Sequence, residues 1–246
     1  MITLTPLPDL PEIAPGDDLA RLLTAAAASA GVTLERGVLV LCQKIVSKAE
    51  GRLVALADVE PSELAREIAS EHEKDPRHIE IVLRETKRIV RRAHGVLICE
   101  TQHGFVCANA GVDLSNAPGP DVAVLLPTDP DGSARALLDD LGQLGARELA
   151  VVVTDTFGRP WREGLVDVAI GSAGLAPIDD QRGGADRSGR ELAVTAMATP
   201  DQLAAAAGLL MVKASGIAAV FVGGYTPEGD GTLSELVRDS ATDLFR

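Results

Sequence analysis

The sequence has few aromatic residues and few cysteines. Of its 246 residues, one is Trp, one is Tyr and four are Phe, so Leu, Val, Ile and Ala must form most of the core. The three cysteines, Cys42, Cys99 and Cys107, form neither a C-x-x-C pair nor an even disulfide set, and all lie in apolar, strand-like runs. We therefore expect free, buried thiols in a reducing cytoplasm.

The chain also lacks a positive charge balance and long apolar runs. Its net charge of -13 at pH 7 argues against a general nucleic-acid or anionic-membrane binder, because those partners need a cationic surface. A small anionic ligand stays compatible with this charge, since local Arg and Lys clusters and metal ions decide its binding. The N-terminus does not resemble a signal peptide, and no apolar run approaches the ~18 residues of a membrane span, so we expect no membrane contact.

Several familiar motifs are missing. The chain has no G-x-x-x-x-G-K-[ST] P-loop, no G-x-G-x-x-G fingerprint and no histidines at zinc-ligand spacing. Strand and helix patterns mix without regular βαβ alternation, so we predict an α+β fold with mixed sheets rather than a Rossmann or P-loop fold. Its length allows one large domain or two small lobes. The patterns predict strands over 2–8, 37–42, 95–100, 105–108, 122–127, 151–154, 191–198 and 217–222, and helices from 16–18 to 30, over 61–92 with a break near 75–76, over 134–144 and over 199–215.

The stretch Val151–Gly164, VVVTDTFGRPWREG, is the centre of the functional site that we predict. A buried strand delivers Asp155 and Thr156 at its end, and hard divalent cations prefer such oxygen ligands. Arg159 and Arg162 follow in a loop, where they could grip phosphate or carboxylate oxygens in bidentate fashion. The alternative is a strand followed by a polar turn with a surface ion pair.

Two other stretches carry groups of the same chemistry. Residues 43–52 place two lysines and a serine after a strand, which suits phosphate contacts, although a solvated lysine face is the alternative. Residues 109–116 place Asp113 and Asn116 in a tight loop, as a second metal ligand and a hydrogen-bonding amide, and an ordinary Asx-rich turn is the alternative. The basic residues of 77–92 form either an electropositive edge for an anionic substrate or a solvated helix face, and the polar loop 179–190 could close over an anionic ligand.

Three stretches together carry a resemblance to a known family. They are KIVSKAEGR at 44–52, ANAGVDLSN at 108–116 and VTDTFGRPWREG at 153–164, and LPEI at 10–13, LLPTDPDGSAR at 125–135 and the ending DLFR support them. In order and over nearly the whole chain, they resemble the coenzyme F420-0:L-glutamate ligase family. The resemblance implies one ligase domain over residues 1–246, in one body or two lobes, with an unusual α+β fold and an intertwined homodimer. Some relatives carry a further, nitroreductase-like domain, so the chain fits a stand-alone enzyme or a first half.

The resemblance also implies an activity and its residues. The activity is GTP-dependent addition of L-glutamate, in γ-linkage, to coenzyme F420-0 through an acyl phosphate, with release of GDP and phosphate. One or two Mg²⁺ or Mn²⁺ ions, and K⁺, are the implied cations. Lys48, with Arg159 and Arg162, would neutralise charge on the transferred phosphoryl group. The implied metal ligands are Asp113, Asp155 and Thr156, and the implied nucleotide contacts are Leu10, Pro11, Glu12, Ile13, Lys48, Asn116, Gln43 at a place where some relatives carry Ser, and Gln202 within the segment 195–202.

Two alternatives from other classes share these groups. A metal-dependent phosphohydrolase would use the same acids and arginines to position water, and it would hydrolyse GTP without F420-0 or glutamate. A non-catalytic nucleotide-binding module would bind GTP without turnover. No Ser-His-Asp or Cys-His arrangement indicates a covalent nucleophile.

Overall fold

The middle strands of the protein's central sheet are apolar on both faces. The computed structural model describes residues 1–239 and 241–243, so most of the DLFR ending lies outside the described residues. The five strands of the central sheet lie in the order β1-β12-β2-β8-β9, and only the pair β2 and β8 runs parallel. The strands are β1 (Thr3–Pro6), β2 (Arg36–Cys42), β8 (Glu148–Arg159), β9 (Arg162–Ala173) and β12 (Ala219–Gly223).

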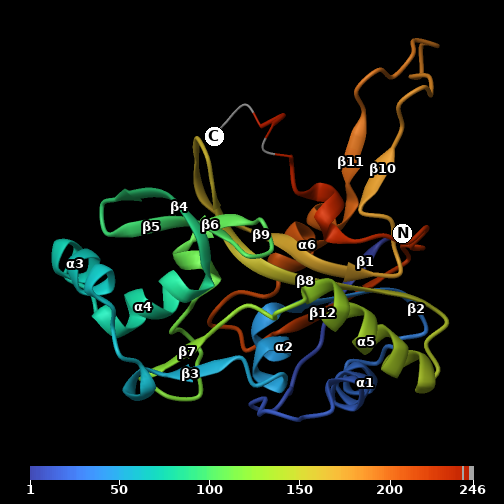
Figure 1. Ribbon diagram of the computed structural model, residues 1–246. Helices are drawn as coiled ribbons and strands as arrows, with labels where there is room; N and C mark the ends of the chain where they lie inside the picture. The colour runs from blue at the N-terminus through green and yellow to red at the C-terminus, as the bar shows by residue number, and fades with distance from the viewer. Residues whose placement is uncertain (240, 244–246) are drawn as a thin grey trace.

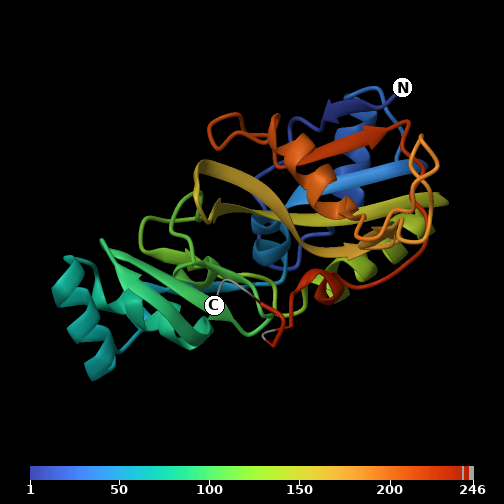
Figure 2. The ribbon, with the colours of Figure 1, turned by 90° about the horizontal axis from the view of Figure 1, so that it is seen from above.

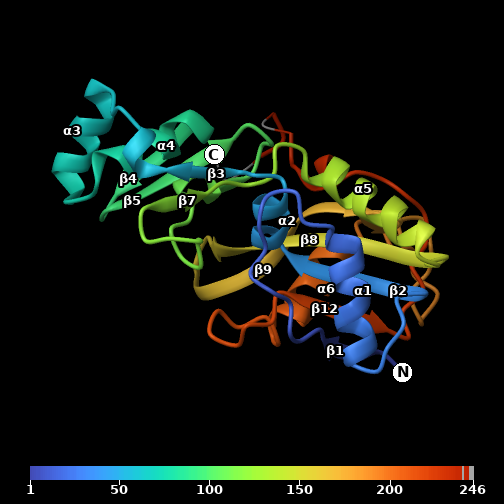
Figure 3. The ribbon, with the colours of Figure 1, turned by 90° about the horizontal axis from the view of Figure 1, so that it is seen from below.

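Helices cover both faces of this sheet, as Figures 1 and 3 show. Leu39 and Leu41 of β2 face one core, and Val38 and Val40 face the other, because side chains alternate along a strand. Asp18 and Asp129 cap α1 and α5 with their carboxylates. The first core lies under α1 (Leu19–Ser29), α2 (Gln43–Ala49) and α5 (Pro130–Gln143), and the second under α6 (Thr199–Gly208) and the 3₁₀ turn η3 (Leu233–Leu236).

Residues 53–125 surround a separate core at one end of the molecule, on the left in Figures 1 and 2. Two small sheets, β4-β5-β6 and β3-β7, pack there with two helices. A turn at 101–104 joins β5 to β6 in an antiparallel hairpin. The elements are β3 (Leu53–Ala55), η1 (Leu56–Asp58), α3 (Glu63–His72), α4 (Pro76–Glu85), β4 (Thr86–Ala93), β5 (Val96–Thr101), β6 (Val106–Ala108), η2 (Asn109–Gly111) and β7 (Val122–Val124).

The helix predicted over 61–92 is wrong in its last part, from residue 86 on. The break near Asp75-Pro76 is confirmed, since Asp75 caps α4 and Pro76 is its first residue. Residues 86–93 nevertheless form β4, which pairs with β5. Lys87 and Arg88 reach across this pair to the buried carboxylate of Glu100. A partner strand, which local pattern does not reveal, thus overrides helical spacing.

Three further elements differ from the prediction. The strand β8 does not end at Thr156; it continues to Arg159 and turns at Pro160–Trp161 into β9. Of the strand predicted over 191–198, only β11 (Ala196–Ala198) forms, pairing with β10 (Ile178–Asp180) as the base of an arm that projects from the body (Figure 1). The last helix ends at Gly208 rather than near Ser215. The mixed α+β class is confirmed, and no described helix is long and apolar enough to cross a membrane.

Gly171→Ala is expected to destabilise the protein by about 3 kcal/mol or more, because a methyl group there has no room. A Cβ at Gly171 would lie 2.3 Å from the carbonyl oxygen of Pro130, where β9 meets the start of α5. Gly142→Ala is the matched control: nothing lies within 4 Å of its Cβ position. Denaturant unfolding should show the control at wild-type stability or up to about 1 kcal/mol above it. Equal stability of the two variants would contradict the close approach.

Candidate active site

One cavity of about 640 Å³ opens at the carboxyl end of β2, beside Asp155 and Thr156 of its parallel neighbour β8. Crevices at this edge are the usual ligand sites of such sheets, and the volume lies within the usual range for small-molecule sites. Segments distant in sequence meet here: 10–13, α2, 108–117, β8 and 211–218. Of the residues implied by the family resemblance, the cavity is lined by Leu10, Pro11, Glu12, Ile13, Lys48, Asp113, Asn116, Asp155 and Thr156.

Asp113 is held on one wall by a dense set of hydrogen bonds. Its Oδ2 accepts from Lys44 Nζ at 2.7 Å and from Ser115 Oγ at 2.8 Å, and its Oδ1 accepts from the Ser115 N–H at 2.8 Å. Burial alone would raise the pKa of Asp113, but the bonds from Lys44 and Ser115 outweigh it and lower the pKa to about 2. Asp113 is therefore an ionised, fixed oxygen donor at neutral pH.

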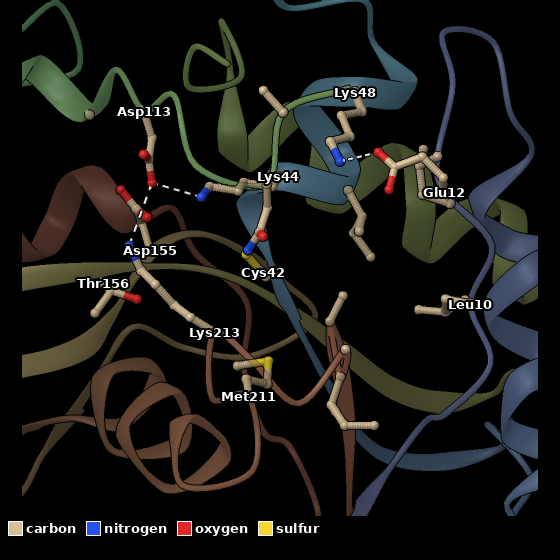
Figure 4. Close-up of a pocket in the computed structure, with 18 of the residues that line it drawn as sticks. Leu10, Glu12, Cys42, Lys44, Lys48, Asp113, Asp155, Thr156, Met211 and Lys213 are labelled. Carbon is tan, nitrogen blue, oxygen red and sulfur yellow. Dashed lines mark hydrogen bonds and ion pairs between the residues drawn. The ribbon is translucent and has the colours of Figure 1, made fainter. Parts of the chain in front are cut away.

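Asp155 faces Asp113 from β8 (Figure 4) and has the opposite electrostatics. Burial raises the pKa of its carboxyl to about 7. The Thr156 N–H and the charge of Lys44 oppose this rise, and the carboxylates of Asp113 and Asp167 add to it. Two carboxylates of unequal acidity thus share one cavity, and a cation between them would favour the charged form of both.

The two lysines of α2 point into the same cavity because they are four residues apart on one helix face (Figure 4). Lys44 pairs with Asp113, and Lys48 pairs with Glu12 of the 10–13 segment. The Lys48 side chain is only 7% exposed, whereas that of Glu12 is 68% exposed. The alternative of a solvated lysine face is therefore wrong.

The donor set of this cavity suits a hard divalent cation. Asp113 and Asp155 supply carboxylate oxygens and Thr156 a hydroxyl, which are the ligands that Mg²⁺ and Mn²⁺ prefer. Burial raises the pKa of Asp155 to about 7, and a bound cation would offset this cost of ionising the carboxyl. Among residues 1–239 and 241–243, no three His, Cys, Asp or Glu side chains form a complete ligand cluster, so a bound cation would also need phosphate or water oxygens.

Comparisons with known proteins match the whole chain to one family. A model of the F420-0:Gamma-glutamyl ligase family matches residues 9–224. The chain belongs to this ligase family. The Coenzyme F420:L-glutamate ligase of Methanothermobacter thermautotrophicus is 45% identical over 251 residues, spanning 100% of the chain and 99% of that protein. The proteins of the same name from Methanopyrus kandleri and Archaeoglobus fulgidus are 44% and 39% identical, each over 100% of the chain and over 98% and 96% of their own lengths.

Four residues implied by the resemblance to the F420-0:gamma-glutamyl ligase family do not line the cavity. Gln43 is fully buried, and its Oε1 accepts from Ser47 Oγ at 2.7 Å. Arg159 and Arg162 are exposed at the tip of the β8–β9 hairpin, where Arg159 donates to the backbone of Glu163. Gln202 is exposed on α6. Their predicted roles stay predictions, because the structure does not place these four side chains at the cavity.

Conversely, the cavity of this ligase-family chain contains two lysines, Lys44 and Lys213, that the family resemblance does not assign to the site. Lys44 was only one of two lysines in a suggestive segment, yet it is the hydrogen-bond partner of Asp113. Lys213 lies 3.7 Å from Asp113 Oδ2, beside Met211 in the segment that follows α6 (Figure 4). We predicted that the helix continues to Ser215, so the sequence did not indicate that these residues form a segment lining the cavity. The four-residue spacing of Lys44 and Lys48 was the available signal for the first lysine.

Lys44→Met is expected to lower the free energy of unfolding at pH 7 by about 1–2 kcal/mol in metal-free buffer. The pKa of Asp113 is lowered in the folded protein, so its contribution to stability is present above its ordinary pKa and is lost as pH falls toward 2. The deficit of the variant should therefore shrink between pH 5 and pH 3. Urea unfolding at pH 7 and pH 3 measures it, with Lys74→Met as control. An equal deficit at both pH values would assign the effect to lost packing.

Proposed function

We propose that the protein is a GTP-dependent ligase that adds L-glutamate, in γ-linkage, to coenzyme F420-0. Membership of the F420-0:gamma-glutamyl ligase family supports the reaction class and the substrates. The observation that carries the nucleotide and metal dependence is the cavity itself, which combines two carboxylates with Lys44, Lys48 and Lys213. Such a mixture suits a polyphosphate accompanied by a divalent cation.

A carboxylate does not form an amide with an amine in water, because its leaving group is poor. The reaction therefore needs activation of the carboxylate. A carboxylate oxygen of F420-0 attacks the γ-phosphorus of GTP, the bond to the β-phosphate oxygen breaks, and GDP leaves. The α-amine of glutamate then attacks the acyl carbon, phosphate departs with the bonding electrons, and the amine loses a proton. Positioning and charge neutralisation drive such a transfer, so no covalent protein nucleophile is required.

The residues of the cavity take distinct parts in this scheme. Lys48 and Lys213 neutralise phosphate charge, and Asn116 supplies an amide to the nucleotide. Asp113, Asp155 and Thr156 would hold Mg²⁺ or Mn²⁺, which when bound supplies charge neutralisation and Lewis acidity at phosphate oxygens. Lys44 keeps Asp113 ionised and oriented. K⁺ is a further expected cation.

The assembly and compartment are part of the same proposal. The β10–β11 arm leaves the body without further strand partners among the described residues, and Val194 on it is 87% exposed. A lone two-stranded hairpin is marginal in water, which favours an intertwined homodimer in which the arm packs on a second copy. Light scattering on purified protein tests this. The free thiols of Cys42, Cys99 and Cys107 favour a reducing cytoplasm.

The decisive experiment is mass spectrometry of F420-0 incubated with the protein, GTP, L-glutamate and Mg²⁺. A mass gain of one or more glutamate residues, with one GDP per addition, is the expected result, and it also counts the additions. GTP consumption with unchanged F420-0 would replace the ligase by a phosphohydrolase. GTP binding without consumption would leave a non-catalytic nucleotide-binding module.

A further inference from the structure

A β-bulge in β9 decides which residue lies opposite Thr156. The pair β8–β9 matches Val153 with Gly171 but Thr154 with Ala169, so β9 contains one extra residue, Ile170. Beyond this bulge Thr156 lies opposite Asp167; without it, the register would place Val168 there. Directly opposite residues of antiparallel strands share a face. The bulge therefore brings a carboxylate to the hydroxyl of Thr156.

The helix α6 fixes this bulge from its first turn. Breaking the ladder frees the backbone N–H of Ala169, and the side chain of Asp201 accepts its hydrogen bond at 2.9 Å. A buried N–H without a partner would cost about 1–3 kcal/mol. Asp201 thus holds the shifted register and fixes Asp167 opposite Thr156.

The far end of α6 confines the Asp167 side chain. Its Oδ1 accepts a 2.6 Å hydrogen bond from the Thr156 hydroxyl. Its Oδ2 lies so close to α6 that a Cβ at Gly208 would be 2.4 Å from it. Asp167 itself does not line the cavity, whereas Thr156 does. Seen from the cavity, the Asp167 carboxylate therefore lies behind the Thr156 hydroxyl, and α6 leaves it no room to turn toward the helix.

We propose that Asp167 is a positioning residue that prepares Thr156 as a cation ligand. A hydroxyl has one proton and two lone pairs, and a metal ion needs a lone pair. By taking the proton on the side away from the cavity, Asp167 leaves the lone pairs of Thr156 free toward it. This inference rests on the proposed cation site of the ligase.

The test compares Mn²⁺ binding by Asp167→Asn, Thr156→Val and the double variant, measured by electron paramagnetic resonance without substrates. Each single variant is expected to raise the Kd for Mn²⁺ about tenfold or more. The double variant should be no weaker than Thr156→Val, because Asp167 acts through that hydroxyl. Asp139→Asn, an exposed acid on α5, should bind as wild type.

Gly208→Ala gives an independent second variant, since its methyl group displaces the Asp167 carboxylate without changing its chemistry. It should weaken Mn²⁺ binding as Asp167→Asn does while keeping a wild-type melting temperature within a few degrees. Wild-type affinity in Asp167→Asn, or losses in the double variant that simply add, would overturn the proposal. Product formation by the wild type, followed in parallel by mass spectrometry, separates the two claims. If the wild type forms product but does not bind Mn²⁺, only the positioning role is overturned. If the wild type binds Mn²⁺ and Asp167→Asn weakens this binding, but no product forms, only the ligase function is overturned.

Discussion

Asp155→Asn is expected to lower glutamate addition at least about a hundredfold while making the metal-free protein more stable. The carboxylate faces Asp113 across the cavity, so its loss leaves a cation with one charged ligand instead of two. The amide keeps the size of the side chain and removes the burial cost that raises the pKa of Asp155 to about 7. Activity and stability should therefore change in opposite directions.

The pH dependence of stability separates this account from simple unfolding. The pKa of Asp155 is raised in the folded protein, so the ionised group destabilises the fold above pH 7, and the cost fades as pH falls toward its ordinary pKa near 4. The stability gain of the variant is then largest at pH 8, at most about 4 kcal/mol, and is nearly absent at pH 4. Thermal melts in metal-free buffer and activity against Mg²⁺ concentration measure both effects. A variant active at low Mg²⁺ would refute the ligand role, and Asp139→Asn is the control.

The sequence predicted those parts of the fold in which local pattern and tertiary environment agree. The strands β2 and β8 have continuous apolar runs because both faces are buried, and Asp18 and Pro76 mark helix starts that the structure confirms. The prediction of a helix was wrong for β4 because the charged residues of this strand pair with Glu100 on β5. Only tertiary contacts bring β5 alongside β4. The β9 bulge left no local signal either.

For the candidate site, sequence motifs identified the groups, and the fold decided which of them meet. Asp113 and Asp155 lie in different motifs, and the structure places both in one cavity. Arg159 and Arg162 follow Asp155 closely in sequence, yet β8 continues as a strand to Arg159, which pairs with Arg162 of β9, and both arginines lie at an exposed tip beyond the cavity. Proximity in sequence was therefore a poor guide to proximity in space, and Lys213, far along the chain, is the nearer cation to Asp113.

Lys48→Ala is expected to raise KM for GTP about tenfold or more and to lower kcat, while KM for glutamate stays near its wild-type value. Lys48 is almost fully buried and has Glu12 as its ion-pair partner, in the segment that the family resemblance assigns to the nucleotide. Removing a buried ammonium group deprives the phosphates of a fixed positive charge. Glu12, being mostly exposed, regains water and costs little stability.

Steady-state kinetics with each substrate varied in turn distinguishes this role from general damage to the site. Lys48→Arg keeps the charge but not the compact ammonium, so it should recover part of kcat without restoring KM for GTP fully. Lys74→Ala, at the turn between α3 and α4, serves as the control for loss of a lysine elsewhere. An equal rise in KM for GTP and for glutamate would contradict the assignment, because a phosphate-binding lysine acts on only one of the two substrates. A purely structural Lys48 would instead lower stability in both variants and leave both KM values unchanged.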